Sequence, residues 1–221
     1  MQTDDSQEFS QEFSQEFSQE FSQEFSRDFA LILAAGFSTR MGTCKTTLRW
    51  HNQQTLLRYQ VEQLLQANIT PLVILGAHNA HRQIDCPSGS RVVIKRDKAR
   101  SKTSSVLTGL AALPQKFSTV MISAVDQPRS ADIYQTLLQN YQQHKALITA
   151  PCYRSKMGHP LLFSHQLLPN LKAIRESTLG LRDLTQTLSS KIKRVEFLTP
   201  EILIDINDRK AYLHHSVNHF A

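Results

Sequence analysis

Short apolar runs alternate with amphipathic segments along most of the chain. The apolar runs are rich in branched residues, which is typical of buried strands, and they lie at 29–34, 72–75, 91–95, 118–124 and 146–150. The segments between them repeat apolar residues at helical spacing, and they lie at 56–66, 104–113 and 131–144. Strands that alternate with helices predict an α/β fold, Rossmann-like, with a mostly parallel central sheet and helices on both faces.

The alternation changes after Pro151. Short strand-like pieces follow at 160–163, 194–197 and 202–206, around a predicted helix at 179–188. No hinge-like linker separates them from the preceding strands and helices. We therefore expect residues 29–221 to form a single domain with additional elements in its C-terminal half.

The first 28 residues differ in kind from the rest. The unit Ser-Gln-Glu-Phe occurs five times without change from Ser6, and residues 1–26 hold seven acidic residues and no basic one. Perfect repetition, regularly spaced acidic residues and the lack of branched aliphatic residues favour a disordered or loosely helical tail, which we assign to residues 1–28. The alternative is an acidic arm that docks on a basic surface, and deletion of residues 2–26 distinguishes the two through activity and oligomer size.

The net charge of the whole chain, +6, hides this division. Residues 27–221 hold all 25 Lys and Arg but only 12 Asp and Glu, a net charge of +13 that suits an anionic ligand. No apolar run reaches the roughly 18 residues that span a membrane, and the N-terminus lacks the pattern of a secretory signal. Cys44, Cys86 and Cys152 are too widely spaced for a zinc site, an iron–sulfur site or a disulfide framework, so we expect a cytoplasmic protein.

The loop after the first predicted strand carries the strongest candidate chemistry. It reads AAGFSTRMGTCK, and ligands of open α/β sheets bind beyond the carboxyl ends of the strands. Gly36 and Gly42 let backbone N–H groups approach a ligand, and Ser38 adds a hydroxyl donor. Arg40 and Lys45 add positive charge. These features predict a phosphate-binding loop; the alternative is an ordinary loop with incidental basic residues.

Two known phosphate-binding loops do not match this segment. A P-loop has four residues between its glycines and Lys-Ser/Thr directly after the second. Here five residues separate Gly36 from Gly42, and Thr43 and Cys44 precede Lys45. The dinucleotide fingerprint GxGxxG requires glycines that the loop lacks.

An aspartate, Asp126, follows the fourth predicted strand at the same edge of the sheet. Magnesium in nucleotide sites uses one or two carboxylates together with phosphate oxygens, so Asp126 is a candidate metal ligand. It is equally placed to cap the helix that begins near Ser130, and the pattern alone leaves both interpretations open.

The segment from Leu33 to Lys45 resembles the nucleotidyltransferases of molybdenum-cofactor biosynthesis, whose first strand is followed by LAAGxSxRMGxxK. Every specified position of that motif is present, and the resemblance extends over residues 29–213. It implies a fold of the nucleotide-diphospho-sugar transferase type, and the double alanine is similar to the cytidylyltransferase branch. The triphosphate-binding residues that it implies are Ala34, Ala35, Gly36, Ser38, Arg40, Gly42 and Lys45.

The metal-binding residues implied by the resemblance lie further along the chain. Asp126 stands in a DQP motif whose Asp binds the metal in the family. Ile204–Asp208 is similar to a DIDTPEDY or DINTPEDY segment, which implies that Asn207 contacts the metal and leaves Asp205 a weaker candidate. The family's TPE is absent here, and Asp208 suits a cap on the last helix.

The resemblance also implies residues on the acceptor side. Gly158, His159 and Pro160 match the start of a GHPVLF segment that borders the acceptor site. A lone His is more often structural, but its place in this segment favours a site role. Ser104 and Ser105 match a Ser-Ser pair beside the nucleotide.

The basic run at 91–102 departs from the family pattern VxNxxWxxG. Lys95, Lys98 and Ser101 replace its Asn, Trp and Gly, which leaves the choice between CTP and GTP open. The run is either a solvated face or a guide for an anionic acceptor. It contains no aromatic residue, which argues against nucleic-acid binding.

Together these features predict a Mg²⁺-dependent nucleotidyltransferase that moves CMP or GMP from a nucleoside triphosphate to a molybdopterin-type acceptor, with Arg40, Lys45 and Asp126 as catalytic residues. The implied protein partner is a molybdoenzyme or its chaperone. One alternative is transfer to a sugar phosphate or another small phosphate. The other is a non-catalytic cofactor- or nucleotide-binding protein.

Overall fold

A computed structural model describes residues 28–97 and 101–217. The predictions for the acidic repeat, and for Lys98 and Arg100 in the basic run, lie outside the described residues. No helix within the described ranges is long and apolar enough to cross a membrane.

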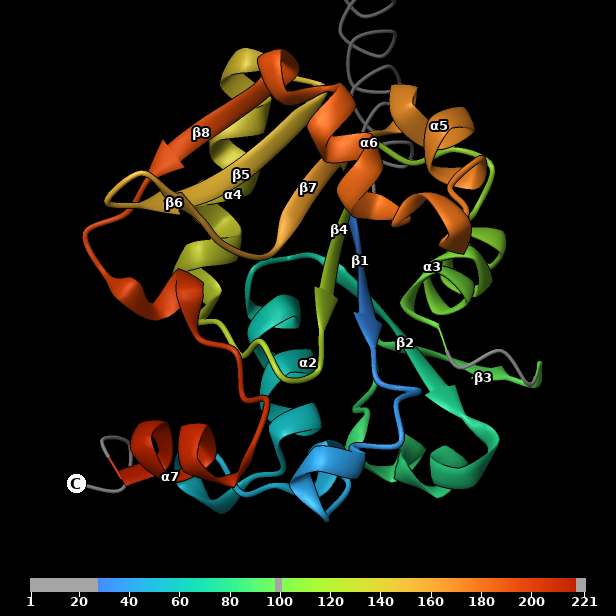
Figure 1. The fold of residues 1–221 in the computed structure, drawn as a ribbon, viewed down its shortest axis with the longest axis vertical. Coiled ribbons are helices and arrows are strands. Elements are labelled where there is room, and N and C mark those ends of the chain that lie inside the picture. Colours follow the sequence, from blue (N-terminus) through green and yellow to red (C-terminus); the bar gives the residue numbers. More distant parts are fainter. Residues whose placement is uncertain (1–27, 98–100, 218–221) are drawn as a thin grey trace, which may run out of the picture.

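A single eight-stranded sheet forms the centre of the fold (Figure 1). Its strand order is β3-β2-β1-β4-β7-β5-β6, and β8 pairs with β5. β1 to β4 run parallel, β7 is antiparallel to both of its neighbours, and β8 is parallel to β5. The strands are β1 Asp28–Leu33, β2 Thr70–Gly76, β3 Arg91–Lys95, β4 Thr119–Ala124, β5 Ile148–Tyr153, β6 Lys156–Met157, β7 Leu161–Ser164 and β8 Ile192–Glu196.

Helices cover both faces of this sheet, as the hydrophobic pattern predicts (Figure 1). On one face α2 and α4 bury residues such as Leu57, Val61 and Leu137 against the strands. On the other face α3 and α5 bury residues such as Val106 and Leu171. The helices are α2 Leu56–Gln66, α3 Lys102–Ala111, α4 Ala131–His144, α5 Leu168–Lys172, α6 Leu181–Thr187 and α7 Arg209–Val217.

The predicted strand at 202–206 is wrong. A short 3-10 helix, Pro200–Leu203, opens the segment instead. The carbonyl oxygens of Ile202 and Ile204 accept hydrogen bonds from the side chain of Arg129 rather than from a neighbouring strand. The helix predicted from residue 179 begins later, at Leu181, because Leu179 and Gly180 have positive φ angles of 63° and 59°.

Candidate active site

The carboxyl ends of β1, β2, β3 and β4 border a cavity of about 590 Å³. This volume is within the range of small-molecule sites. Several of the site residues predicted from the sequence line it together. They are Ala34, Ala35, Gly36, Ser38, Arg40, Lys45, Ser105, Asp126 and Asn207.

The Ser38 side chain makes a hydrogen bond across the loop after β1. The Ser38 hydroxyl accepts a hydrogen bond from the Lys45 backbone N–H at 3.1 Å, and the Ser38 carbonyl accepts one from the Met41 N–H at 2.9 Å. Ser38 and Gly42 both have left-handed backbone conformations, with φ of 52° and 69°. Gly42 ends the single helical turn between them and does not line the cavity. These contacts fix the backbone between Arg40 and Lys45.

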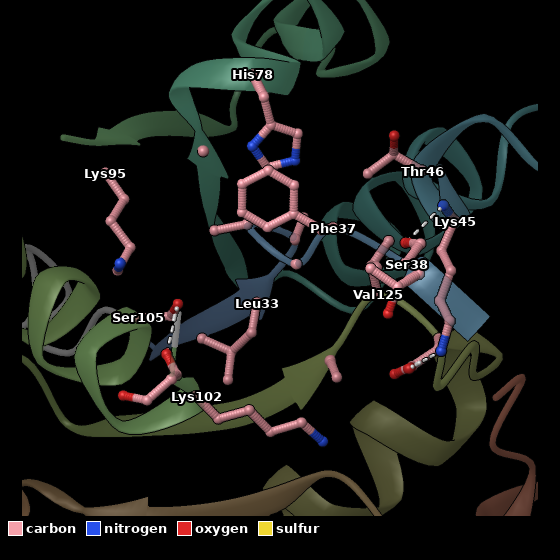
Figure 2. A pocket seen from close by; sticks show the side chains of 18 of the residues that line it. Leu33, Phe37, Ser38, Lys45, Thr46, His78, Lys95, Lys102, Ser105 and Val125 are labelled. Carbon is pink, nitrogen blue, oxygen red and sulfur yellow. Dashed lines mark hydrogen bonds and ion pairs between the residues drawn. The ribbon is translucent and has the colours of Figure 1, made fainter. Parts of the chain in front are cut away.

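Lys45 and Asp126 form an ion pair in the cavity wall (Figure 2), with Nζ 2.6 Å from Oδ2. Each residue is only 8% exposed. The other carboxylate oxygen, Asp126 Oδ1, is buried and has no hydrogen-bond partner among the described residues. An unpartnered buried carboxylate oxygen is costly unless a ligand satisfies it.

The helix-cap interpretation of Asp126 fails in the structure. α4 begins at Ala131 after Ser130, and the backbone N–H of Ser130 donates to Glu201 Oε1 at 2.7 Å. A carboxylate from a distant segment therefore occupies the place at the helix start, and the Asp126 side chain stays in the cavity wall.

Asn207 reaches the cavity because its segment is tied to the β4 end. The Ile206 backbone N–H donates to the Asp126 carbonyl at 2.8 Å, and Arg40 Nη2 lies 3.5 Å from Asn207 Oδ1. Asp205 is not part of the cavity lining. Asp208 accepts the Ala211 N–H at 2.8 Å at the start of α7, which confirms its predicted cap role.

These oxygen donors fit Mg²⁺ bound together with a nucleotide. The described ranges contain no group of three or more His, Cys, Asp or Glu that would form a self-sufficient metal site. Mg²⁺ uses few protein ligands when phosphates supply the rest, and both Asp126 and Asn207 line the same cavity.

Basic side chains line much of the cavity, and the sequence predicted only some of them as site residues. Lys95, from the end of β3, pairs with Asp97, which also accepts the Ser104 hydroxyl at 2.6 Å. Ser104 is thereby turned to Asp97 and does not line the cavity, whereas Ser105 does. Lys102 extends from the start of α3 towards the strand ends (Figure 2).

An aromatic pair at the cavity rim was missed by sequence reasoning. Phe37 stacks on His78 with ring centroids 4.1 Å apart and planes at 12° (Figure 2). Phe37 remains 51% exposed. His78 follows β2, as Asp97 follows β3, so the rule that parallel strand ends share one edge would have placed both near the loop.

The predicted acceptor residues Gly158, His159 and Pro160 do not line this cavity. They precede β7, which pairs with β4 so that Leu161 lies opposite Ile122 near the Asp126 end. Burial, together with the charges of Arg129 and Lys102, lowers the pKa of His159 to about 4, while Asp126 opposes this shift. The His159 carbonyl oxygen accepts a hydrogen bond from Arg129 Nε at 2.8 Å, which ties this turn to the segment that follows Asp126.

Solved structures share this architecture. The Mycobacterium sp. strain JC1 homologue of Rv0371c aligns with a TM-score of 0.74 at 20% identity, over 88% of this chain and 97% of that one. Rv0371c from Mycobacterium tuberculosis in complex with manganese gives 0.68 at 18%, over 87% and 98%. The 4-diphosphocytidyl-2C-methyl-D-erythritol synthase of Anaerococcus prevotii gives 0.68 at 13%, over 90% and 98%.

These likenesses establish the nucleotide-diphospho-sugar transferase-like fold. No curated protein sequence is significantly similar to the chain. A family model, that of the MobA-like NTP transferase domain, matches residues 30–193, which include the loop after β1 and Asp126. The chain thus belongs to the family of MobA-like NTP transferase domains and is an NTP-dependent nucleotidyltransferase.

Proposed function

We propose that the protein transfers CMP, or GMP, from a nucleoside triphosphate to a molybdopterin-type phosphate acceptor in a Mg²⁺-dependent reaction. The observation that carries the proposal is the buried Lys45–Asp126 pair, which joins the loop after β1 to a carboxylate with one unsatisfied oxygen. A triphosphate-bound metal would satisfy that oxygen.

The charge of the cavity supports an anionic nucleotide. Among the residues that the structure describes, the lining holds two carboxylates, Asp97 and Asp126, against five basic side chains. The basic residues are Arg40, Lys45, Lys95, Arg96 and Lys102. Such an excess of positive charge concentrates a triphosphate and offsets the charge that grows on a departing pyrophosphate.

The oxygen donors at Asp126 and Asn207 support the metal. Asp126 and Asn207 would hold Mg²⁺, which when bound would lower the charge repulsion around the α-phosphorus. Rv0371c, which shares the fold, was crystallised with manganese. Lys45 would hold the Asp126 carboxylate in one orientation, and Arg40 would do the same for the Asn207 amide.

The transfer step needs orientation more than proton transfer. An oxygen of the acceptor phosphate forms a bond to the α-phosphorus while the bond from that phosphorus to the bridging β-phosphate oxygen breaks. The bonding electron pair leaves with pyrophosphate. A phosphate oxygen is already an adequate nucleophile, so alignment and charge stabilisation carry the reaction and no general base is required.

The acceptor would enter beside His159 and Lys102. Since the pKa of His159 is lowered to about 4, its imidazole is neutral at pH 7 and can donate or accept one hydrogen bond. Lys102 supplies the positive charge for the acceptor phosphate. The product would then pass to a molybdoenzyme or its chaperone in the cytoplasm.

Transfer to a sugar or polyol phosphate is the second candidate. It is favoured by the likeness to the Anaerococcus prevotii synthase, whose name describes a diphosphocytidyl product on a methylerythritol acceptor. The double alanine at 34–35, similar to the cytidylyltransferase branch, fits CTP in both cases.

The test measures pyrophosphate release with CTP, GTP and UTP against molybdopterin, its molybdenum-loaded form and a panel of sugar phosphates. We expect the highest turnover with CTP and a molybdopterin-type acceptor, and dependence on Mg²⁺. Turnover confined to sugar phosphates would reject the pterin acceptor but keep the nucleotide site. The matched control is the Asp126→Asn variant with the same substrates.

A further inference from the structure

Arg129 is a buried cation without a carboxylate partner. It is 1% exposed, and no Asp or Glu of the described ranges lies within ion-pair distance of it. Burial lowers the pKa of Arg129 to about 10, so the guanidinium is still charged at neutral pH. A buried charge in this situation must be satisfied by other polar groups.

Four backbone carbonyl oxygens satisfy the Arg129 guanidinium. Nε donates to His159 O at 2.8 Å, and Nη1 donates to Pro128 O at 2.6 Å. Nη2 donates to Ile202 O at 2.8 Å and to Ile204 O at 3.0 Å. The planar fork of arginine suits this arrangement, because its donors have fixed directions.

The four acceptors belong to three segments that are far apart in the sequence, and each segment carries a candidate site residue. Pro128 follows Asp126 in the turn after β4, and His159 stands in the turn before β7. Ile202 and Ile204 precede Asn207 in the segment that leads to α7 (Figure 1). We call these three segments, joined through Arg129, the clasp.

Further hydrogen bonds join the same three segments. Glu201 accepts the Ser130 N–H at 2.7 Å and lies near its hydroxyl at 3.3 Å. The His159 N–H donates to Ile202 O at 3.1 Å. None of the three segments is joined to the others by regular strand pairing at these positions. The side-chain bonds of Arg129 and Glu201 therefore set their relative placement together with two isolated backbone bonds, His159 N–H to Ile202 O and Ile206 N–H to Asp126 O.

We infer that Arg129 is a positioning residue for nucleotidyl transfer: it fixes Asn207 and His159 relative to Asp126 through the backbone of their segments. The inference rests on the proposed function, in which the metal side and the acceptor side must be held in register for in-line attack. Arg129 itself does not line the cavity. The loop after β1 makes no bond to it, so binding of the nucleotide without metal should be independent of Arg129.

The test compares Arg129→Met and Arg129→Lys with wild type. Titration calorimetry gives the Kd of CTP and GTP with and without Mg²⁺, and pyrophosphate release gives kcat and KM. We expect kcat to fall at least tenfold in Arg129→Met and less in Arg129→Lys. In both variants we expect the nucleotide Kd without metal to stay within twofold of the wild-type value. The gain in nucleotide affinity on adding Mg²⁺ should be smaller than in wild type.

A second variant covers the case in which removal of Arg129 prevents folding. Glu201→Ala weakens the clasp from the other segment and leaves the guanidinium and its carbonyl partners in place, so it should show the same split with a smaller loss of kcat. Arg154→Gln, on the exposed turn after β5, is the matched control and should behave as wild type.

The inference would be overturned if folded Arg129 variants kept the wild-type kcat and the wild-type gain in nucleotide affinity from Mg²⁺. If the Arg129 variants do not fold, the same result in Glu201→Ala would overturn it. A wild-type protein that releases pyrophosphate with no acceptor would overturn the proposed acceptor chemistry instead. The Mg²⁺-dependent Kd would still decide the role of Arg129 in that case, since it needs no acceptor.

Discussion

The nucleotide side and the acceptor side of the cavity are built in different ways. The loop after β1 is held by bonds within itself, such as the Lys45 N–H to Ser38 Oγ across seven residues. The acceptor side depends on the clasp, whose Arg129 bonds span 30, 73 and 75 residues. A local loop keeps its shape when distant parts change, whereas the clasp keeps its shape only when three segments are all in place.

Asp126, where the two sides meet, should give the largest effect. Asp126→Asn keeps the shape of the side chain but removes its negative charge. That charge pairs with Lys45 and would attract the metal. We expect kcat to fall by about a thousandfold, which corresponds to several kcal/mol of lost metal-based charge stabilisation. Pyrophosphate release measures the loss, and circular dichroism checks that the fold remains.

The matched control for this variant is Asp208→Asn. Asp208 lies just after Asn207 and caps α7, and Asn caps helices about as well as Asp. Asp208→Asn should therefore turn over at the wild-type rate. Near wild-type turnover in Asp126→Asn would contradict the metal role and remove the main reason for treating the two sides as one site.

Alanine at two glycines, one on each side, should separate stability from binding. A Cβ at Gly158 would lie 2.1 Å from the Ile202 carbonyl oxygen, whereas a Cβ at Gly36 meets nothing within 4 Å. We expect Gly158→Ala to lower the free energy of unfolding by about 2–3 kcal/mol, because backbone must move. Gly36→Ala should stay within about 0.5 kcal/mol.

Urea unfolding measures the stability of both glycine variants, and the nucleotide Kd measures their binding. Gly36→Ala should weaken CTP binding, since the added methyl occupies space beside the phosphates, while its stability is unchanged. Equal stability of the two variants would show that the close approach at Gly158 is relieved elsewhere and that the clasp is less rigid than its bonds indicate.

The same division explains how much could be predicted from the sequence. The loop motif, the aspartate after β4 and the alternation of strands and helices are all local patterns, and they placed nine predicted residues on one cavity. The strand predicted at 202–206 failed because its carbonyls bind Arg129, and a pattern of apolar residues does not reveal a partner about 75 residues away. The Phe37–His78 stack was missed for a different reason: the shared edge of parallel strands brings the two residues near each other, but it does not show that their rings stack.

The pH dependence of stability should report on the acceptor side. Burial, with Arg129 and Lys102, lowers the pKa of His159 from 6.5 to about 4. Between these values the unfolded chain binds a proton that the folded chain does not, so stability falls as the pH drops from about 6.5 to about 4. We expect His159 to contribute about 1–3 kcal/mol to this loss.

Urea unfolding at several pH values tests this contribution. His159→Gln should flatten the curve below pH 6.5 relative to wild type, whereas His144→Gln, at the end of α4 away from the clasp, should leave the curve unchanged. An unchanged pH dependence in His159→Gln would mean that the imidazole is hydrated in the folded protein.

The smallest effect should come from the rim of the nucleotide side. Phe37→Ala removes the ring that stacks on His78 and leaves the loop backbone intact. If the exposed face of Phe37 packs against the base, the nucleotide Kd should rise roughly fivefold, about 1 kcal/mol, at the lower end of measured base–aromatic stacking. Phe37→Tyr should bind as wild type, and Ile84→Ala, another exposed apolar residue outside the cavity, serves as the control.

Because stacking tolerates every base, the loss should be similar for CTP and GTP, so a loss confined to one nucleotide would instead make Phe37 a determinant of base choice. An unchanged Kd for both would place the base elsewhere in the cavity, towards Lys95 and Ser105, and the nucleotide side would then depend on the loop backbone and its cations alone.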